Sequence, residues 1–408
     1  MFSGFWGIVP LAARRHDETV DVSVAATLAD GSVEVAKLAE VRLVATEIES
    51  SLGAGEATAM RPVAGRIAVC MATFNPRLDL FERQVESLRA QTYTDWTCVV
   101  SDDHSDPECL EGMTAILGDD ARFSLSRSDR RLGFYRNFER ALMSASPDAS
   151  LLALCDQDDR WYPEKLTVLV KALGSADLTY SDQRIVDPSG HILAPSYWTH
   201  RRNNFSDLTS LLIANTITGA ACLFRRELLD SALPFPLAPG SPYHDHWLAL
   251  VAMATGKISY VDRPLYDYVQ HESAQLGHAR ANRRAPRPSR LRFRPGWRAT
   301  YFYDYWRLRV FSLVLLSRCG VALSPAKRRV LERFLSVESS PIAFAWLAAR
   351  AAWSALDFHE TLGVERGLLG AVLWRRIVAL SRTARWRALP FLPLDASPPP
   401  RPGGRGLF

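Results

Sequence analysis

Apolar segments that end abruptly in acidic side chains are the feature that most constrains the fold of this chain. The segment LLALC, from Leu151 to Cys155, runs directly into Asp156, Asp158 and Asp159. Short apolar runs that stop at polar residues are typical of buried β-strands. In open α/β sheets, ligands bind beyond the carboxyl ends of the strands. The segment therefore predicts a buried strand whose acidic end lies at a functional edge of a sheet.

The same pattern occurs twice earlier in the chain. RIAVCMATFN ends in Thr73, Phe74 and Asn75, and WTCVVSDDHSD ends in the acids Asp102 and Asp103. Apolar residues at helical spacing separate these two segments. Strand, helix and strand in this order predict a parallel βαβ unit with its polar ends on one edge. The predicted fold class is α/β with a mainly parallel sheet, a small N-terminal β unit and a C-terminal helical region.

The three acidic clusters admit more than one interpretation. Crowded carboxylates repel one another unless a cation lies among them, and oxygen ligands suit Mg²⁺ or Mn²⁺. Each cluster alone would also fit a solvated turn or a helix N-cap. Their coincidence at one edge favours a ligand site, with Asp103 holding a nucleoside and Asp159 a metal and diphosphate. Gly133 and Arg136 would then offer backbone amides and a cation to the phosphates.

Further candidates follow in the second half of the sequence. The small residues Thr218 and Gly219 allow close approach of a ligand or, equally, close packing against another strand. Asp245 begins an apolar helix, where it would act either as a general base or as an N-cap. His271 follows the last strand-like segment, where it would serve as a metal ligand or as a structural residue.

Seven ordered motifs give a resemblance to a known family. They are ATFN, SDDHSD, LGFYRNFE, CDQDDRWYPEKL, TGAACLFRREL, HDHW and YVQHES, spread from Arg66 to Gly277. Together they resemble the inverting family-2 glycosyltransferases of the GT-A fold, within them the bacterial rhamnosyltransferase-like branch. The resemblance implies transfer of a hexosyl or deoxyhexosyl group from a nucleoside-diphosphate sugar to a glycan or lipid-linked acceptor, in synthesis of cell-surface polysaccharide.

The resemblance also implies a role for individual residues. Asp103 matches the acid that holds the nucleoside base, with Phe74 beside it. Asp158 and Asp159 match the DxD-type acids, one facing the ribose and the other binding the divalent ion. Asp245 matches the catalytic base, and His271 a residue that closes over the diphosphate or the metal. The assignment of Asp245 implies an acceptor side formed by Thr218, Gly219, His244 and Trp247.

Charge is distributed unevenly along the chain. Residues 280–408 contain 24 Lys and Arg but 7 Asp and Glu, whereas residues 1–279 contain 25 and 37. Arginines mixed with aromatic residues in the basic part suit an anionic membrane surface. A helical bundle with a solvated basic face explains the pattern equally well. Nucleic acid is not expected as a partner, because the acidic front half opposes polyanion binding.

Domain limits follow from these changes in composition. We expect an N-terminal extension with a β hairpin and linker (1–64), a GT-A domain (65–279), a basic helical region (280–389) and a disordered tail (390–408). Scattered cysteines without a CxxC pair and the lack of a membrane-spanning run favour a cytoplasmic protein, either free or peripheral at the inner face of the membrane. The alternative functions are a nucleotidyltransferase and a non-catalytic protein that binds through the basic tail.

Overall fold

The computed structural model describes residues 18–27, 32–43, 65–197, 203, 205–271, 296–356 and 362–383. They fall into two units, residues 1–59 and residues 60–408, which are taken in turn. Several expected segments lie outside the described residues: the linker that precedes Gly65, the first residues of the basic helical region and the tail from Pro390.

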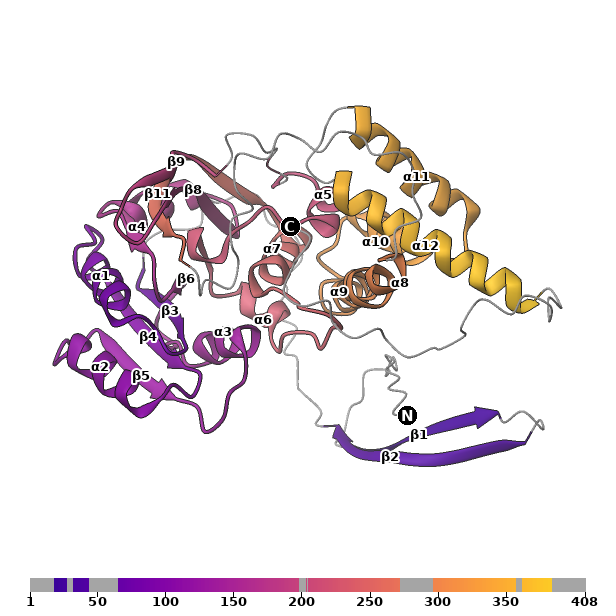
Figure 1. Cartoon of the computed structure of the whole chain (residues 1–408), viewed down its shortest axis with the longest axis horizontal. Helices are drawn as coiled ribbons and strands as arrows, with labels where there is room; N and C mark the ends of the chain where they lie inside the picture. Colours follow the sequence, from indigo (N-terminus) through magenta and orange to yellow (C-terminus); the bar gives the residue numbers. More distant parts are fainter. Residues whose placement is uncertain are drawn as a thin grey trace. The chain divides into compact units, whose positions relative to one another are not determined.

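The first unit is a two-stranded antiparallel ribbon (Figure 1). Strands β1 (Glu18–Thr27) and β2 (Val33–Leu43) pair from Glu18 opposite Leu43 to Thr27 opposite Val33. A register shift between Val22 and Ser23 marks a β-bulge, which increases the local twist of the ribbon.

The second unit contains a nine-stranded sheet in the order β5-β4-β3-β6-β10-β8-β11-β7, with β9 paired to β8. Its strands are β3 (Ile67–Thr73), β4 (Trp96–Asp102), β5 (Phe123–Arg127), β6 (Leu151–Asp156), β7 (Arg160–Trp161), β8 (Leu178–Val186), β9 (Ile192–Ala194), β10 (Cys222–Arg225) and β11 (Ile258–Val269). The predicted α/β fold is confirmed, and the sheet is mixed. Strands β5, β4, β3 and β6 are parallel, whereas β10 is antiparallel to both of its neighbours.

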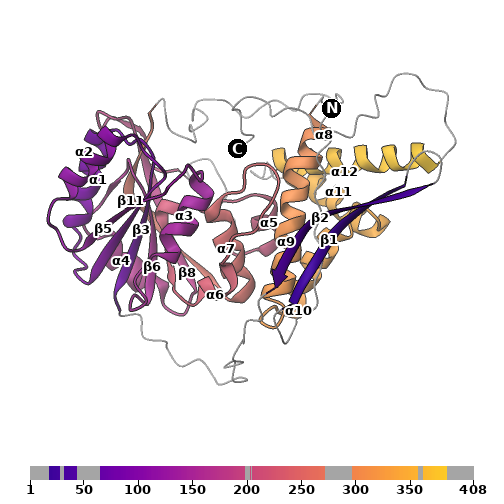
Figure 2. The ribbon, with the colours of Figure 1, turned by 90° about the horizontal axis from the view of Figure 1, so that it is seen from below.

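Helices cover both faces of this sheet (Figure 2). They are α1 (Leu78–Arg89), α2 (Pro107–Leu117), α3 (Phe134–Met143), α4 (Lys165–Leu173), α5 (Leu208–Ile213), α6 (Leu228–Ala232) and α7 (His244–Thr255). Helices α1 and α2 pack together on one face, and α3 packs on β3 and β4 from the other. Helix α1 buries Leu80, Phe81, Val85 and Leu88, each contributing roughly 1.5–3 kcal/mol of burial free energy.

The C-terminal region adds further helices to the same unit (Figure 1). They are α8 (Trp297–Thr300), a π-helical turn (Tyr301–Tyr305), α9 (Trp306–Arg318), α10 (Pro325–Leu335), α11 (Pro341–Leu356) and α12 (Leu362–Thr383). Phe311 of α9 packs 5.2 Å from the ring of Trp247 in α7. Arg318 donates to the carbonyl of Pro234 at 2.7 Å. No helix among the described residues is long and apolar enough to cross a membrane.

Candidate active site

The strand register brings the predicted polar ends to one edge of the sheet. Thr73 is paired with Asp102, and Ala72 with Asp156, so β3, β4 and β6 end almost level. The 3₁₀ turn Gly219–Ala221 lies at the same edge, because β10 starts there and runs antiparallel beside β6. Asp103, Asp159 and Asp245 are not helix N-caps, since the N-caps of α2, α4 and α7 are Asp106, Glu164 and Tyr243.

Asp156 and Asp159 lie in surroundings that disfavour their charge. Burial, followed by the charges of Asp158 and Asp245, raises the pKa of Asp156 to about 7. Asp159 is fully buried, and burial with the neighbouring acids raises its pKa well above the ordinary value. Its Oδ1 accepts a 3.4 Å hydrogen bond from the Val269 amide, and its Oδ2 has no partner among the described residues.

Asp158 is joined to His271 across the sheet edge. His271 Nε2 lies 2.6 Å from Asp158 Oδ2, and the His271 side chain is 8% exposed. The contact brings the residue after β11 to the loop after β6, as expected for two residues of one site. Sequence reasoning placed both here but could not tell that they contact each other.

Asp245 lies in the first turn of α7 with both carboxylate oxygens hydrogen bonded. Its Oδ1 accepts from Asn215 Nδ2 at 3.0 Å and from the His246 amide at 2.6 Å, and its Oδ2 from the Gly219 amide at 3.3 Å. These bonds favour the charged form, but burial outweighs them and raises the pKa of Asp245 to about 7. Asp245 also acts on the pKa of Asp156, so the two carboxylates belong to one site.

Asp103 has a structural task in addition to the predicted one. Its two carboxylate oxygens accept the amides of Leu132 and Gly133, at 2.5 and 2.9 Å, which fixes the loop before α3. Gly133, at φ +82°, therefore directs its amide to Asp103. This differs from the expectation that Gly133 offers its amide to a phosphate. The neighbouring Asp102 is fully buried and accepts from Thr73 Oγ1 at 3.1 Å and from the Ser105 amide at 2.9 Å.

Phe74 and Asn75 connect the loops around this edge. The Phe74 amide donates to Gln157 Oε1 at 2.8 Å, and the guanidinium of Arg131 lies 3.7 Å from the Phe74 ring centroid. Asn75, at φ +39°, exchanges two hydrogen bonds with Asp106. These contacts bring the loops after β3, β4 and β6 together, with the Phe74 ring partly exposed.

Arg136 contacts other protein groups in this structure. Its guanidinium pairs with Glu139 and donates to the carbonyl of Phe235 at 3.0 Å. To serve as the predicted phosphate cation, it would have to leave both. Arg131, one residue before Leu132, is exposed and lies over Phe74 at the same edge. Sequence reasoning gave Arg131 no role, and its proximity to Phe74 was visible only in three dimensions.

The predicted acceptor side divides into residues near Asp245 and one in the core. Gly219 leaves room for His244, because a Cβ there would lie 2.6 Å from His244 Nε2. His244 is stacked on Phe138 at 3.7 Å, and neither ring nitrogen has a partner among the described residues. Burial lowers the pKa of His244 to about 3, so its ring is neutral. Trp247 is fully buried, with its indole N–H donated to the Ala232 carbonyl at 2.8 Å.

Lys165 is a residue that sequence reasoning missed. It lies in the motif CDQDDRWYPEKL, is fully buried, and is among the charges that act on Asp156 and Asp159. Burial lowers its own pKa to about 7. A lysine at the start of a helix usually remains solvated, so only the fold reveals that this side chain is buried and that its charge acts on the acids.

The side chains at this edge include groups that can bind a divalent cation. Asp159 Oδ2 is a buried carboxylate oxygen without a partner among the described residues, which is costly unless a cation or donor reaches it. His271 would be the second ligand, but in this structure its ring contacts Asp158. Across the described residues, no three His, Cys, Asp or Glu side chains already surround a common point. A cation would therefore have to separate the pair Asp158–His271.

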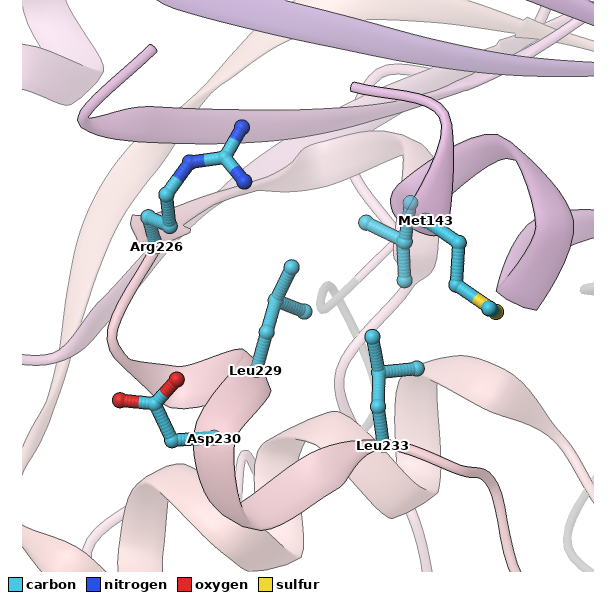
Figure 3. Close-up of a pocket in the computed structure, with 6 residues that line it drawn as sticks. Met143, Arg226, Leu229, Asp230 and Leu233 are labelled. Atoms are coloured by element: carbon cyan, nitrogen blue, oxygen red, sulfur yellow. The ribbon is translucent and has the colours of Figure 1, made fainter. Parts of the chain in front are cut away.

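A surface hollow of about 350 Å³ lies away from this edge. It is lined by Leu142, Met143, Arg226, Leu229, Asp230 and Leu233, and Figure 3 shows the apolar side chains between Arg226 and Met143. The Arg226 amide bonds to the Ser150 carbonyl, just before β6, whereas the acids follow the end of β6. The hollow is therefore at the opposite edge of the sheet and is not part of the candidate active site.

Part of this chain is similar to known proteins. Residues 68–233 match the family model "Glycosyl transferase family 2". A search of curated proteins finds no match. Among solved structures, S. aureus TarS 1-349 in complex with UDP-GlcNAc aligns with a TM-score of 0.49 and 17% identity, over 78% of this chain and 91% of that one. The mannosyltransferase PcManGT from Pyrobaculum calidifontis, in complex with GDP-Man and Mn²⁺, aligns at 0.42 and 18%, over 77% and 87%.

These structural values are too low to carry an inference about ligand or activity. The family match covers the strands and loops that hold Asp103, Asp158 and Asp159, and the observed sheet has the α/β architecture expected for it. The match reaches the family and no branch within it, so the rhamnosyltransferase-like branch stays a prediction. It also does not favour the nucleotidyltransferase or the non-catalytic alternative. The protein is a glycosyltransferase whose residues 68–233 form a family 2 glycosyltransferase domain.

Proposed function

We propose that the protein transfers a sugar from a nucleoside-diphosphate sugar to a hydroxyl group, with inversion at the anomeric carbon and Asp245 as the base. The observation that carries this proposal is the environment of Asp245. Burial raises its pKa to about 7, so that near neutral pH about half of the carboxyl groups are ionised and each ionised carboxylate is basic enough to accept a proton. Three donors from Asn215, Gly219 and His246 fix its orientation.

The proposed reaction is a single displacement. Asp245 removes the proton of the acceptor hydroxyl while that oxygen attacks the anomeric carbon from the face opposite the diphosphate. The carbon–oxygen bond to the leaving nucleoside diphosphate breaks as the new glycosidic bond forms. His244 and Gly219, which contact the surroundings of Asp245, would border the acceptor. Trp247 is omitted from the proposed acceptor side because its side chain is packed in the core.

The donor would lie at the ends of β3, β4 and β6. Phe74 offers a partly exposed ring for the base, and Asp103 fixes the loop that faces it. Asp158 would contact the ribose, and Asp159 with His271 would hold Mg²⁺ or Mn²⁺. A bound divalent cation would offset the negative charge that grows on the leaving diphosphate. The orphaned Asp159 Oδ2 supports this assignment.

The test of the base is Asp245→Asn. The amide keeps the size of the carboxyl but cannot accept the proton, so we expect transfer to fall by at least about 100-fold while donor binding changes little. Asp159→Ala should instead weaken binding of the donor with Mn²⁺, measured by calorimetry with a panel of nucleoside diphosphate sugars. Undiminished transfer by purified Asp245→Asn would show that another group is the base.

We also propose that the acceptor is a glycan or lipid-linked molecule at the cytoplasmic face of the membrane, in cell-surface polysaccharide synthesis. Helix α11 supports contact with lipid, because its exposed positions are uncharged: Pro341, Ile342, Ala345, Ala349, Ala352 and Trp353. Ile342 is 82% and Trp353 71% exposed. The described part of this region is rich in arginine, which complements anionic headgroups.

Flotation with liposomes tests the contact with lipid. We expect the protein to float with vesicles that contain phosphatidylglycerol and not with neutral vesicles. Ile342→Ser combined with Trp353→Ala should reduce flotation. Val321→Ser is the matched control, because Val321 is 92% exposed but lies between α9 and α10. Equal flotation of the double variant and the control would remove α11 from the proposal.

A further inference from the structure

Lys165 has a buried amino group that the proposed reaction does not use directly. It is the first residue of α4 and has no exposed surface. Its Nζ lies 3.7 Å from the Trp161 ring centroid and 4.1 Å from that of Tyr266. A buried ammonium is costly unless it is paired, and two aromatic faces offset only part of that cost.

The direct hydrogen-bond partner of Lys165 belongs to the turn beside Asp245. Lys165 Nζ donates to the carbonyl of Ala220 at 2.5 Å. The preceding residue, Gly219, donates its amide to Asp245 Oδ2 at 3.3 Å. One short turn therefore accepts from Lys165 on one side and donates to Asp245 on the other.

A second connection holds the other end of this turn. Thr218 Oγ1 accepts from Gln183 Nε2 at 3.2 Å, and Gln183 Oε1 accepts from the Tyr266 hydroxyl at 3.1 Å. The ring of Tyr266 is one of the two that contact the Lys165 ammonium. Lys165, Tyr266 and Gln183 thus form a buried network, here called the Lys165 network, which contacts the turn at Thr218 and at Ala220.

We propose that Lys165 is a positioning residue for the base: the Lys165 network fixes the turn from Thr218 to Ala221, and the turn fixes Asp245. This inference rests on the proposed role of Asp245. Asp245 must stay within hydrogen-bond reach of the acceptor hydroxyl, and a displacement of about 1 Å can cost on the order of 100-fold in rate. The residues of the Lys165 network lie in β8, β11 and α4, whereas the 3₁₀ turn Gly219–Ala221 has only three residues.

A competing role for Lys165 makes a different prediction. Its charge also acts on Asp156 and Asp159, so it would serve simply as their counter-ion. Loss of a counter-ion would change binding of the donor and its metal, and thus the donor KM. Loss of the support for Asp245 would lower kcat and leave the donor KM nearly unchanged. The ratio of the two effects separates the roles.

The test compares three variants of the full-length chain. Lys165→Met keeps the unbranched side chain and removes the ammonium. Tyr266→Phe keeps the ring and removes the hydroxyl that holds Gln183. Lys327→Met is the matched control, because Lys327 Nζ also donates to a backbone carbonyl, that of Gly256 at 2.9 Å, at the far end of α7 from Asp245.

We expect kcat to fall by about tenfold or more in Lys165→Met and by about threefold to tenfold in Tyr266→Phe, with donor KM within about twofold of the wild type. Lys327→Met should keep the wild-type kcat. Circular dichroism and melting curves establish that each variant is folded, and Tyr266→Phe decides the question if Lys165→Met does not fold.

The proposal is overturned if folded variants keep the wild-type kcat, if donor KM rises in place of a fall in kcat, or if Lys327→Met loses as much activity as Lys165→Met. Asp245→Asn, assayed in parallel, separates the two levels of the argument. Normal transfer by Asp245→Asn overturns the base itself. Abolished transfer by Asp245→Asn with normal kcat in Lys165→Met overturns only the positioning role.

Discussion

The pH dependence of kcat follows from the environment of Asp245. A general base acts in its ionised form, and burial raises the pKa of Asp245 to about 7. About nine-tenths of the enzyme would then be active at pH 8 and about one-tenth at pH 6, so kcat should fall roughly tenfold between these values. An aspartate with the ordinary pKa of about 3.9 would stay ionised over this range, and kcat would not change.

The slope of this acid limb carries further information. Burial and the neighbouring acids raise the pKa of Asp156 to about 7 as well. If transfer requires both carboxylates to be ionised, kcat should fall by up to about a hundredfold for each pH unit on the acid side. The measurement is kcat at saturating donor and acceptor from pH 5 to pH 9. A flat profile would refute the assignment of Asp245 as a base with a raised pKa.

A substitution at Asn215 should shift the pH at which kcat falls. Asn215 Nδ2 donates to Asp245 Oδ1 at 3.0 Å and thereby lowers the pKa of Asp245. Asn215→Asp is isosteric and replaces this donor with a like charge. The pH midpoint of the fall in kcat should therefore rise by about one pH unit or more. Asn75→Asp makes the same change at the Asn75–Asp106 contact, also 3.0 Å, and should leave the limb in place. Equal behaviour of the two variants would contradict the assignment.

Three further predictions concern buried polar groups. Burial raises the pKa of Asp159, so its ionisation lowers the free energy of unfolding increasingly as pH rises above about 4. Asp159→Asn should therefore raise Tm, measured by calorimetry, by about 2–4 °C at pH 8 and leave it unchanged at pH 4. His244→Phe keeps the stack on Phe138 and removes two unpaired nitrogens. We expect a higher Tm and a raised acceptor KM. An unchanged acceptor KM would show that His244 does not border the acceptor. Burial raises the pKa of the Cys70 thiol to about 12, so iodoacetamide at pH 8 should leave Cys70 of the folded protein unmodified, which mass spectrometry would detect.

The parallel half of the sheet could be predicted from the sequence because its signals are local. Strands β3, β4 and β6 are apolar runs stopped by polar residues, and the apolar residues at helical spacing between the first two form α1, Leu78–Arg89. Parallel pairing then brings the strand ends together without further information. The observed register agrees with that expectation, because Thr73 lies opposite Asp102 and Ala72 opposite Asp156.

The separation of roles among the acids could not be predicted, because it depends on partners distant in sequence. Asp102 and Asp103 are adjacent, yet one is bonded to Thr73 and Ser105 and the other to the amides at 132 and 133. Burial of Lys165 likewise depends on Ala220, which is 55 positions away. Spacing in the sequence carries no record of such contacts, so the network behind the site emerged only from the fold.

The antiparallel strand β10 explains how a base far along the chain joins the donor-side acids. If β10 ran parallel to β6, the turn that precedes it would lie at the opposite edge, with the hollow near Arg226. Because β10 starts at the acidic edge, the turn Gly219–Ala221 lies beside the end of β6 and presents its amide to Asp245. The mixed sheet thus unites the two halves of the proposed site. Parallel strands bring together the acids proposed to bind the donor, and the antiparallel strand places the turn that contacts Asp245, the proposed base.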